Sequence, residues 1–150
     1  MAMPDAPVRS HPVHRYPLRV QWEDTDAAGI VYYANYLRFI ERARSDLLLQ
    51  HGIDQRGLMA PSADGIAFAV RACQIEYIKP ARLHEDLTVA TAIAELRGAS
   101  VTLGQDVWRG EDLLAAAEVR LACIDSDGRP RRIPPAIAGL FATLSTNLSR

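Results

Sequence analysis

The residues best suited to chemistry are three neighbouring acids, Glu23, Asp24 and Asp26, which are followed by Gly29. A carboxylate can attack a carbonyl directly or take a proton from water, and a glycine lets backbone come close to a ligand. The same acids also fit a simpler interpretation, as solvated turn residues that favour the start of a following helix. The composition of this stretch leaves both interpretations open.

A calcium loop fits these acids only in part. Asp24, Asp26 and Gly29 occupy positions 1, 3 and 6 of an EF-hand pattern. Position 5 is Ala28, however, and position 12 is Asn35 instead of the bidentate glutamate. A phosphatase-like Asp-x-Asp site normally lies on a parallel sheet, which a chain of 150 residues without βαβ repeats does not supply. We therefore expect no metal at the acids.

The elements around the acids are a strand and a long helix. Residues 16–22 alternate apolar and polar side chains, which predicts a half-buried strand with Leu18, Val20 and Trp22 on one face. From Tyr33 onwards the spacing becomes helical, with an apolar face made of Tyr33, Leu37, Ile40, Ala43 and Leu47. The acids therefore lie between the end of a strand and the start of a helix.

This order places a carboxylate beside backbone N–H groups that have no partner within the helix. The N–H groups near Tyr33 and Ala34 would hold the negative oxygen that forms when a carbonyl is attacked. A base or nucleophile and its oxyanion donors would then share one short loop. Hydrolysis of a thioester needs both parts and no metal.

The helix is predicted to end at Gly52, in a Schellman motif that brings Leu48 against Ile53. A loop over residues 54–65 follows. Four strands are then expected, at 66–77, 87–93, 101–107 and 113–123. The apolar phase of the first of these slips at Cys73, which indicates a bulge. The remaining features are hairpin turns at Gly98 and Gly110 and a short helix after Pro134 and Pro135.

The order strand, long helix, four strands and short helix is typical of an α+β fold in which one antiparallel sheet covers one helix. We expect a single domain over residues 15–145, after a flexible tail at residues 1–14 that lacks the apolar core of a signal peptide. No stretch approaches a membrane span, and the net charge of −1 does not favour nucleic acid. These features predict a cytoplasmic protein, with Cys73 and Cys123 as buried free thiols.

Residues 23–44, which contain the run Asp-Thr-Asp-Ala-Ala-Gly-Ile-Val-Tyr-Tyr-Ala-Asn-Tyr-Leu, closely resemble the 4-hydroxybenzoyl-CoA thioesterase family. The likeness is greatest to its Tol-Pal-associated, YbgC-type branch of acyl-CoA thioesterases. Residues 76–81 also resemble a strand ending of the family, so the resemblance covers most of residues 16–125. It implies a hotdog fold, in which a five-stranded antiparallel sheet wraps around the long helix. It also implies homodimers or homotetramers with active sites at the subunit interface.

On this resemblance, Asp26 takes the position of the catalytic carboxylate. Tyr33 takes the aromatic position whose backbone N–H polarises the thioester carbonyl. Many YbgC-type members carry histidine there, which could titrate where tyrosine packs and donates a hydroxyl. Asp24 is equally acidic, and only the family pattern ranks Asp26 above it. The expected substrate contacts are Gly29, Val31, Tyr32 and Lys79.

Two classes of function follow. The first is an enzyme that hydrolyses short-chain or aromatic acyl-CoA, or an acyl-carrier protein thioester, to the free acid; coenzyme A is then part of the substrate and no cofactor is needed. The second is a non-catalytic module that binds acyl-CoA or an acyl-carrier protein. A hotdog dehydratase would need a histidine paired with an acid, and residues 22–50 contain no histidine. Basic residues that could contact CoA phosphates, or simply face solvent, are Arg71, Lys79, Arg82, Arg97, Arg129, Arg131 and Arg132.

Overall fold

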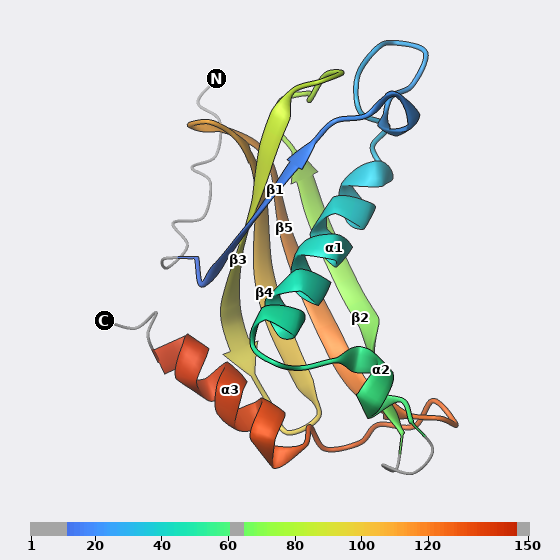
Figure 1. Ribbon diagram of the computed structural model, residues 1–150, viewed down its shortest axis with the longest axis vertical. Coiled ribbons are helices and arrows are strands. Elements are labelled where there is room, and N and C mark those ends of the chain that lie inside the picture. Colours follow the sequence, from blue (N-terminus) through green and yellow to red (C-terminus); the bar gives the residue numbers. More distant parts are fainter. Residues whose placement is uncertain (1–11, 61–64, 147–150) are drawn as a thin grey trace.

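The computed structural model describes residues 12–60 and 65–146 of the chain. Figure 1 shows one curved sheet with a long helix against its inner face. Most of the tail predicted at residues 1–14 lies outside the described residues, and the first strand already begins at His14. The elements in chain order are β1 (His14–Arg19), the 3-10 turn η1 (Trp22–Asp24), α1 (Asn35–Gln50), α2 (Gln55–Leu58), β2 (Ile66–Tyr77), β3 (Asp86–Leu96), β4 (Ser100–Arg109), β5 (Asp112–Asp125) and α3 (Pro135–Thr146).

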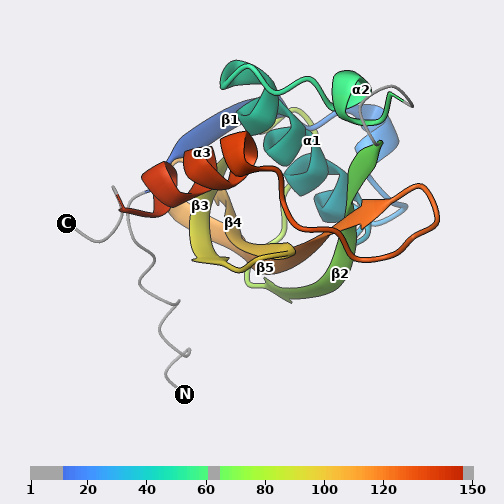
Figure 2. The same ribbon diagram turned by 90° about the horizontal axis from the view of Figure 1, so that it is seen from below.

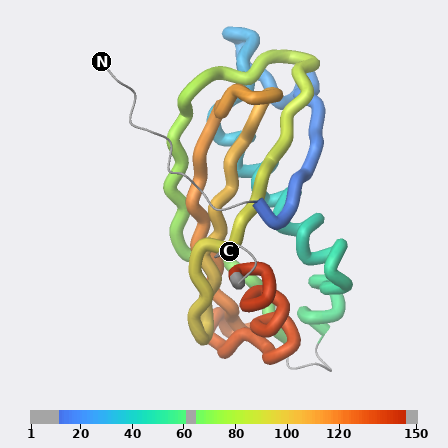
Figure 3. Tube along the Cα trace, turned by 90° about the vertical axis from the view of Figure 1, so that its left-hand side faces the viewer, coloured from blue at the N-terminus to red at the C-terminus, as the bar shows by residue number. Residues whose placement is uncertain are grey.

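The five strands form an antiparallel sheet in the order β1-β3-β4-β5-β2. Figure 2, seen from one end, shows this sheet curving around α1, while α3 packs beside β3. Figure 3, turned by 90° from Figure 1, shows the strands running next to one another. The prediction of one antiparallel sheet around one long helix is therefore confirmed. Within the described ranges, no helix combines the length and apolarity needed to span a membrane.

The rotation of α1 differs from the predicted one. The helix begins at Asn35, so Tyr33 precedes it and is 61% exposed, and Leu37 is 42% exposed. Two apolar series overlap in this sequence, and the structure buries the one with more aromatic area, because that series removes more surface from water. The buried residues of α1 are Tyr36, Phe39, Ile40, Ala43, Leu47 and Leu48.

The end of α1 is the predicted Schellman motif. Gly52 has a φ of +82°, and its N–H donates to the carbonyl of Leu49 at 3.0 Å. The N–H of Ile53 donates to the carbonyl of Leu48 at 2.9 Å. Glycine adopts this left-handed conformation without the steric penalty of a side chain. The chain then forms the four-residue helix α2 where the sequence predicted only loop, with the carboxylate of Asp54 accepting the N–H of Arg56 at 2.9 Å.

The predicted bulge in β2 is confirmed. The pairing of β2 with β5 shifts register between Val70 and Ala72, which leaves Arg71 as the extra residue. The prediction that both cysteines are buried is wrong for Cys73, which is exposed, and correct for Cys123. Cys73 lies on the edge strand of the sheet, where no further strand of the described chain covers it.

A buried amide joins α1 to the sheet. Gln105 in β4 is 0% exposed, and its side-chain nitrogen donates to the carbonyl of Ile40 at 2.8 Å and to the hydroxyl of Thr91 at 3.1 Å. Its side-chain oxygen accepts from the guanidinium of Arg44 at 3.1 Å. These three bonds connect β3, β4 and α1 and fix where the helix lies along the sheet. Burial of the Arg44 guanidinium lowers the pKa of Arg44.

We predict that Gln105→Leu lowers the free energy of unfolding by about 1–3 kcal/mol, because it leaves the Thr91 hydroxyl and the Arg44 guanidinium without this partner. Urea unfolding followed by circular dichroism measures the change. Gln55→Leu in α2 is the control, since its amide makes one exposed 3.4 Å contact, and should change stability by less than about 0.5 kcal/mol. Equal losses in the two variants would contradict the role of Gln105.

Candidate functional site

The chain turns sharply after β1, which ends at Arg19. The prediction that the strand continues to an inward-facing Trp22 is wrong, since Trp22 lies in η1 and is 80% exposed. The cause is Asp24. Its carboxylate accepts the N–H of Gln21 at 2.8 Å, and its own N–H donates to the Gln21 carbonyl at 3.0 Å. These two bonds close the 3-10 turn, and Val20 is the last residue of the segment to face the core.

Asp24 also connects the acidic loop to the start of α1. Its backbone carbonyl accepts the N–H of Tyr32 at 2.9 Å and the side-chain amide of Asn35 at 2.9 Å. The residue is only 8% exposed, and one carboxylate oxygen is already bonded within the turn. Asp24 is therefore placed to hold the loop against the helix.

Asp26 lies in a small hairpin that keeps its side chain at the surface. Its N–H donates to the Ile30 carbonyl at 2.9 Å, and its carbonyl accepts the N–H of Gly29 at 3.0 Å. Gly29 has a φ of +78°, which explains the glycine by backbone conformation. One Asp26 carboxylate oxygen accepts the N–H of Ala28 at 2.8 Å, and the other has no hydrogen bond to any described residue. Asp26 thus presents an exposed carboxylate on a hydrogen-bonded turn.

The start of α1 carries unused N–H donors. Ala34 occupies the N-cap and has no side-chain acceptor to offer. The N–H of Asn35 donates to the Tyr32 carbonyl at 2.8 Å, but those of Tyr33 and Ala34 make no hydrogen bond within the described part of the chain. Because helix N-termini carry partial positive charge, these two donors suit an anion or a developing negative oxygen.

A pocket of about 330 Å³ opens beside this helix start. The Tyr36 ring is 3% exposed, and its hydroxyl accepts the N–H of Ala81 at 3.1 Å; burial raises the pKa of Tyr36. The N–H of Val31 donates to the Ala81 carbonyl at 2.8 Å, so the pocket wall and the acidic loop are tied together. The lining residues are Ile30, Val31, Tyr33, Tyr36, Tyr77, Ile78, Lys79 and Pro80.

The predicted substrate contacts divide into two groups. Val31 and Lys79 line the pocket together with Tyr33. Gly29 and Tyr32 do not line it. Gly29 is exposed in its turn, and Tyr32 is 45% exposed and packs edge-to-face on Tyr33, with ring centroids 4.9 Å apart. The structure thus gathers three of the predicted residues in the pocket.

The cations near the pocket are partly neutralised. The Lys79 ammonium lies 3.2 Å from a carboxylate oxygen of Asp112, and this contact lowers the pKa of Asp112. Arg109 lies 3.0 Å from both Glu85 oxygens and donates to the Pro80 carbonyl at 3.3 Å. The Glu85–Arg109 pair therefore supports a wall of the pocket.

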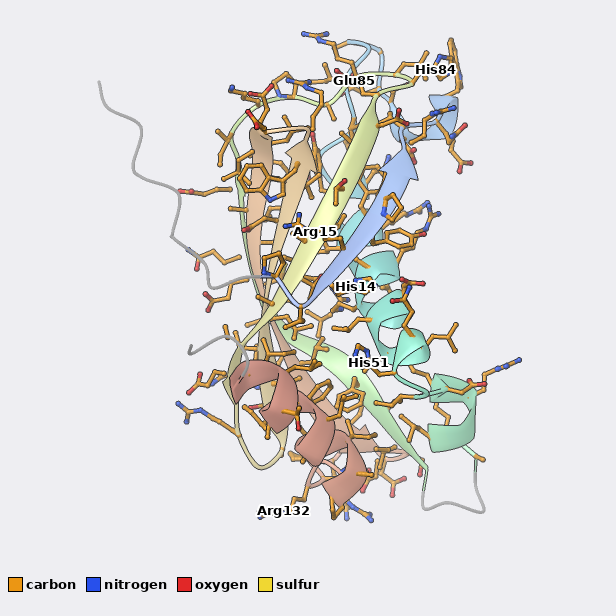
Figure 4. The ribbon with its side chains drawn as sticks, turned by 60° about the vertical axis from the view of Figure 1, so that its left-hand side comes forward. His14, Arg15, His51, His84, Glu85 and Arg132 are labelled. Carbon is orange, nitrogen blue, oxygen red and sulfur yellow. The ribbon has the colours of Figure 1, made fainter. Side chains whose placement is uncertain are left out.

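Other predicted phosphate contacts lie elsewhere. Figure 4 shows Glu85 at the pocket end of the molecule and Arg132 at the opposite end. Arg97 pairs with Glu95 in the hairpin after β3, where Gly98 meets the residues just before α3. Arg82, by contrast, forms an isolated antiparallel β-bridge through its backbone with Ile30, beside the acidic loop. Lys79 and Arg82 are thus the predicted cations that lie beside the site.

Two of the described histidines, His14 and His51, lie apart from the helix start, whereas Figure 4 shows His84 beside Glu85 at the pocket end of the molecule. Figure 4 shows His14 at the beginning of β1 and His51 at the end of α1. The His14 ring bonds Asp46, in the C-terminal half of α1, at 2.7 Å. His51 contacts the carbonyl of Leu47 at 2.9 Å, as expected for a residue at a helix C-terminus.

Sequence reasoning missed Tyr77 as a site residue. Its hydroxyl donates to the Tyr33 carbonyl at 3.0 Å, although 44 positions separate the two residues. The one signal in the sequence is parity, because after the bulge Tyr77 shares the apolar phase of Cys73 and Ile75 and lies just before the strand break at Pro80. Periodicity gives the face on which Tyr77 lies but not the helix end that it meets.

Substitution of Asp24 and of Asp26 should have different effects on the stability of the protein. We predict that Asp24→Ala lowers the free energy of unfolding by about 0.5–2 kcal/mol, because the N–H of Gln21 loses its acceptor. Asp26→Asn should stay within about 0.5 kcal/mol of wild type, since the amide oxygen can still accept the N–H of Ala28. Urea unfolding of both variants measures these changes. A larger loss of unfolding free energy in Asp26→Asn than in Asp24→Ala would contradict the conclusion that Asp24 is the aspartate that holds the loop.

Comparisons with known proteins agree on the family. Residues 20–141 match the thioesterase-like superfamily. The chain is 43% identical to the acyl-CoA thioester hydrolase YbgC of Escherichia coli O6:H1 over 129 residues. This match covers 85% of the present chain and 94% of the Escherichia coli protein. It is 33% identical over 121 residues to a 1,4-dihydroxy-2-naphthoyl-CoA hydrolase of Thermosynechococcus vestitus, with coverages of 80% and 82%. A probable thioesterase from Bartonella henselae superposes with a TM-score of 0.78 at 38% identity and covers 81% of this chain and 98% of that one. The chain therefore belongs to the thioesterase-like superfamily and has its hotdog fold.

Proposed function

We propose that this thioesterase hydrolyses acyl-CoA thioesters with short-chain or aromatic acyl groups, in the cytoplasm, using Asp26 and the N–H donors of Tyr33 and Ala34. The observation that carries the proposal is an exposed Asp26 carboxylate, held on a hydrogen-bonded turn of the loop that leads into α1, together with two N–H groups at the start of α1 that have no partner in the described chain. The Escherichia coli relative is named an acyl-CoA thioester hydrolase. No cofactor is required, because CoA is part of the substrate.

In the proposed reaction, the thioester carbonyl oxygen lies at the start of α1. Asp26 either attacks the carbonyl carbon, giving an anhydride that water hydrolyses, or removes a proton from the attacking water. In both routes the negative oxygen of the tetrahedral intermediate is stabilised by the N–H groups of Tyr33 and Ala34. The C–S bond then breaks, and its electron pair leaves with the sulfur of CoA, which takes up a proton.

The pocket supports the choice of acyl group. Its lining is mostly apolar and aromatic and includes Tyr36 and Tyr77. Aromatic rings pack well edge-to-face against an aromatic acyl group. The Thermosynechococcus relative is named for an aromatic acyl-CoA. Lys79 and Arg82 lie beside the pocket and are the cations that we propose for CoA phosphates, or for the acidic surface of an acyl-carrier protein.

We further propose that the protein is a homodimer or homotetramer built on the free edge of β2. This strand is 12 residues long, and only its β5 side is paired in the described chain. Val70 and Tyr77, which lie along it, are 54% and 45% exposed. A long edge strand with exposed apolar side chains is a template for pairing with another chain. Because Tyr77 meets Tyr33, such an interface would pass beside the site.

For the reaction, we predict that Asp26→Asn lowers turnover by at least about 100-fold, because an amide neither attacks nor takes a proton. Release of free thiol from a panel of short-chain and aromatic acyl-CoAs measures the rate. The matched control is Asp127→Asn, which changes another exposed turn aspartate, after β5, and should leave the rate unchanged.

The same assay separates the two classes of function. Saturable acyl-CoA binding without turnover in the wild type would indicate a non-catalytic binding module. Turnover that is equal in wild type and Asp26→Asn would remove Asp26 from the chemistry while leaving the thioesterase activity.

For the assembly, we predict that Val70→Lys shifts the protein toward a smaller species, because it places a charge at the apolar edge of β2. Sedimentation velocity measures the mass. Leu49→Lys is the control, since Leu49 is 61% exposed but borders the groove between α1 and β1. A wild type that sediments as a monomer would rule out the assembly.

A further inference from the structure

Tyr77 makes a contact that the proposed chemistry does not yet use. It is the last residue of β2, and its hydroxyl donates to the backbone carbonyl of Tyr33 at 3.0 Å. Its ring packs edge-to-face against Tyr33, with centroids 6.1 Å apart, and against Tyr36, with centroids 5.4 Å apart. The same ring lines the pocket of about 330 Å³. One side chain thus touches both the helix start and the acyl pocket.

We propose that Tyr77 is a positioning and specificity residue: its hydroxyl orients the oxyanion donor of Ala34, and its ring limits the size of the acyl pocket. This inference rests on the proposed function. It adds a residue from the end of β2 to a carboxylate and two N–H donors that come from one continuous segment, residues 26–34.

The positioning follows from peptide geometry. A peptide unit is planar and trans, so its C=O and N–H point in opposite directions, and holding the carbonyl fixes the direction of the N–H. The carbonyl of Tyr32, held by the N–H of Asn35 at 2.8 Å, fixes the N–H of Tyr33. The carbonyl of Tyr33, held by Tyr77, fixes the N–H of Ala34. Each of the two donors is therefore aimed by a bond on the opposite side of its peptide.

The two bonds differ in origin. The bond from Asn35 is local and forms in the turn that starts α1. The bond from Tyr77 comes from a strand on the sheet and exists only when β2 and α1 are packed together. A hydrogen bond to the carbonyl also polarises the amide, which makes its N–H a better donor.

The environment keeps the Tyr77 hydroxyl in its donor form. Burial raises the pKa of Tyr77, with smaller contributions from Cys73 and the neighbouring tyrosines. An ordinary tyrosine is already protonated at neutral pH. The hydroxyl therefore remains available as a donor throughout the neutral range.

The first test is Tyr77→Phe, which keeps the ring and removes the hydroxyl. We expect kcat for butyryl-CoA to fall about 3- to 10-fold, as for loss of one neutral hydrogen bond, while KM stays within about twofold. Tyr16→Phe, in β1 and outside the pocket, should leave both constants unchanged. A kcat for Tyr77→Phe equal to that of wild type overturns the positioning role, as does a rise in KM with unchanged kcat.

The second test is Tyr77→Ala, which removes the ring and enlarges the pocket. We expect the ratio of kcat/KM for octanoyl-CoA to that for butyryl-CoA to rise several-fold, and Tyr77→Phe to leave this ratio as in wild type. An unchanged ratio in Tyr77→Ala overturns the specificity role. Wild-type turnover that is lost in Asp26→Asn but unaffected in both Tyr77 variants overturns this inference alone, whereas an inactive wild type overturns the proposed function as well.

Discussion

Burial of one face of α1 inside the curve of the sheet fixes almost everything else in the molecule. Phe39 and Ile40 are each 1% exposed, and burial of side chains of this size contributes about 1.5–3 kcal/mol apiece. This packing sets the rotation of the helix, and the amide of Gln105 sets its place along the sheet. The start of α1 consequently lies at the end of the sheet where β1 stops and β2 connects to β3, so a helix N-terminus, an acidic turn and a pocket meet there.

The candidate site is the place where the chain departs from ordinary helix capping. Ala34 at the N-cap supplies no side-chain acceptor, and the N–H groups of Tyr33 and Ala34 have no partner within the described chain. Natural proteins tend to break such local rules at functional sites. The two aspartates are complementary, since Asp24 is buried and engaged in holding the loop, whereas Asp26 is exposed and has a carboxylate oxygen unused by the described chain.

Local patterns in the sequence predicted much of this arrangement. Alternation located the four later strands, a parity slip located the bulge near Arg71, and Gly52 located the end of α1. The predictions failed where a side-chain hydrogen bond or packing against the sheet overrides the periodicity of the sequence. The bonds of Asp24 to Gln21 pull Trp22 out of its strand pattern, and the choice between two overlapping apolar series in α1 depends on what the sheet covers.

Apart from Lys79, the site was predictable only along one stretch of chain. Asp26, Val31 and Tyr33 are close in sequence, so a strand-to-helix pattern could group them. The contacts of Tyr77 with Tyr33 and of Ala81 with Tyr36 join residues 44 and 45 positions apart. No periodicity encodes such a meeting, because it depends on how β2 and α1 pack.

The most direct test is a crystal structure with an acyl-CoA analogue in which a methylene group replaces the thioester sulfur and the carbonyl is kept. The arrangement described above predicts that the carbonyl oxygen lies about 2.7–3.2 Å from the N–H groups of Tyr33 and Ala34, with the Asp26 carboxylate facing the carbonyl carbon directly or through one water. An analogue whose carbonyl lies away from the start of α1, or on the side opposite Asp26, would contradict it.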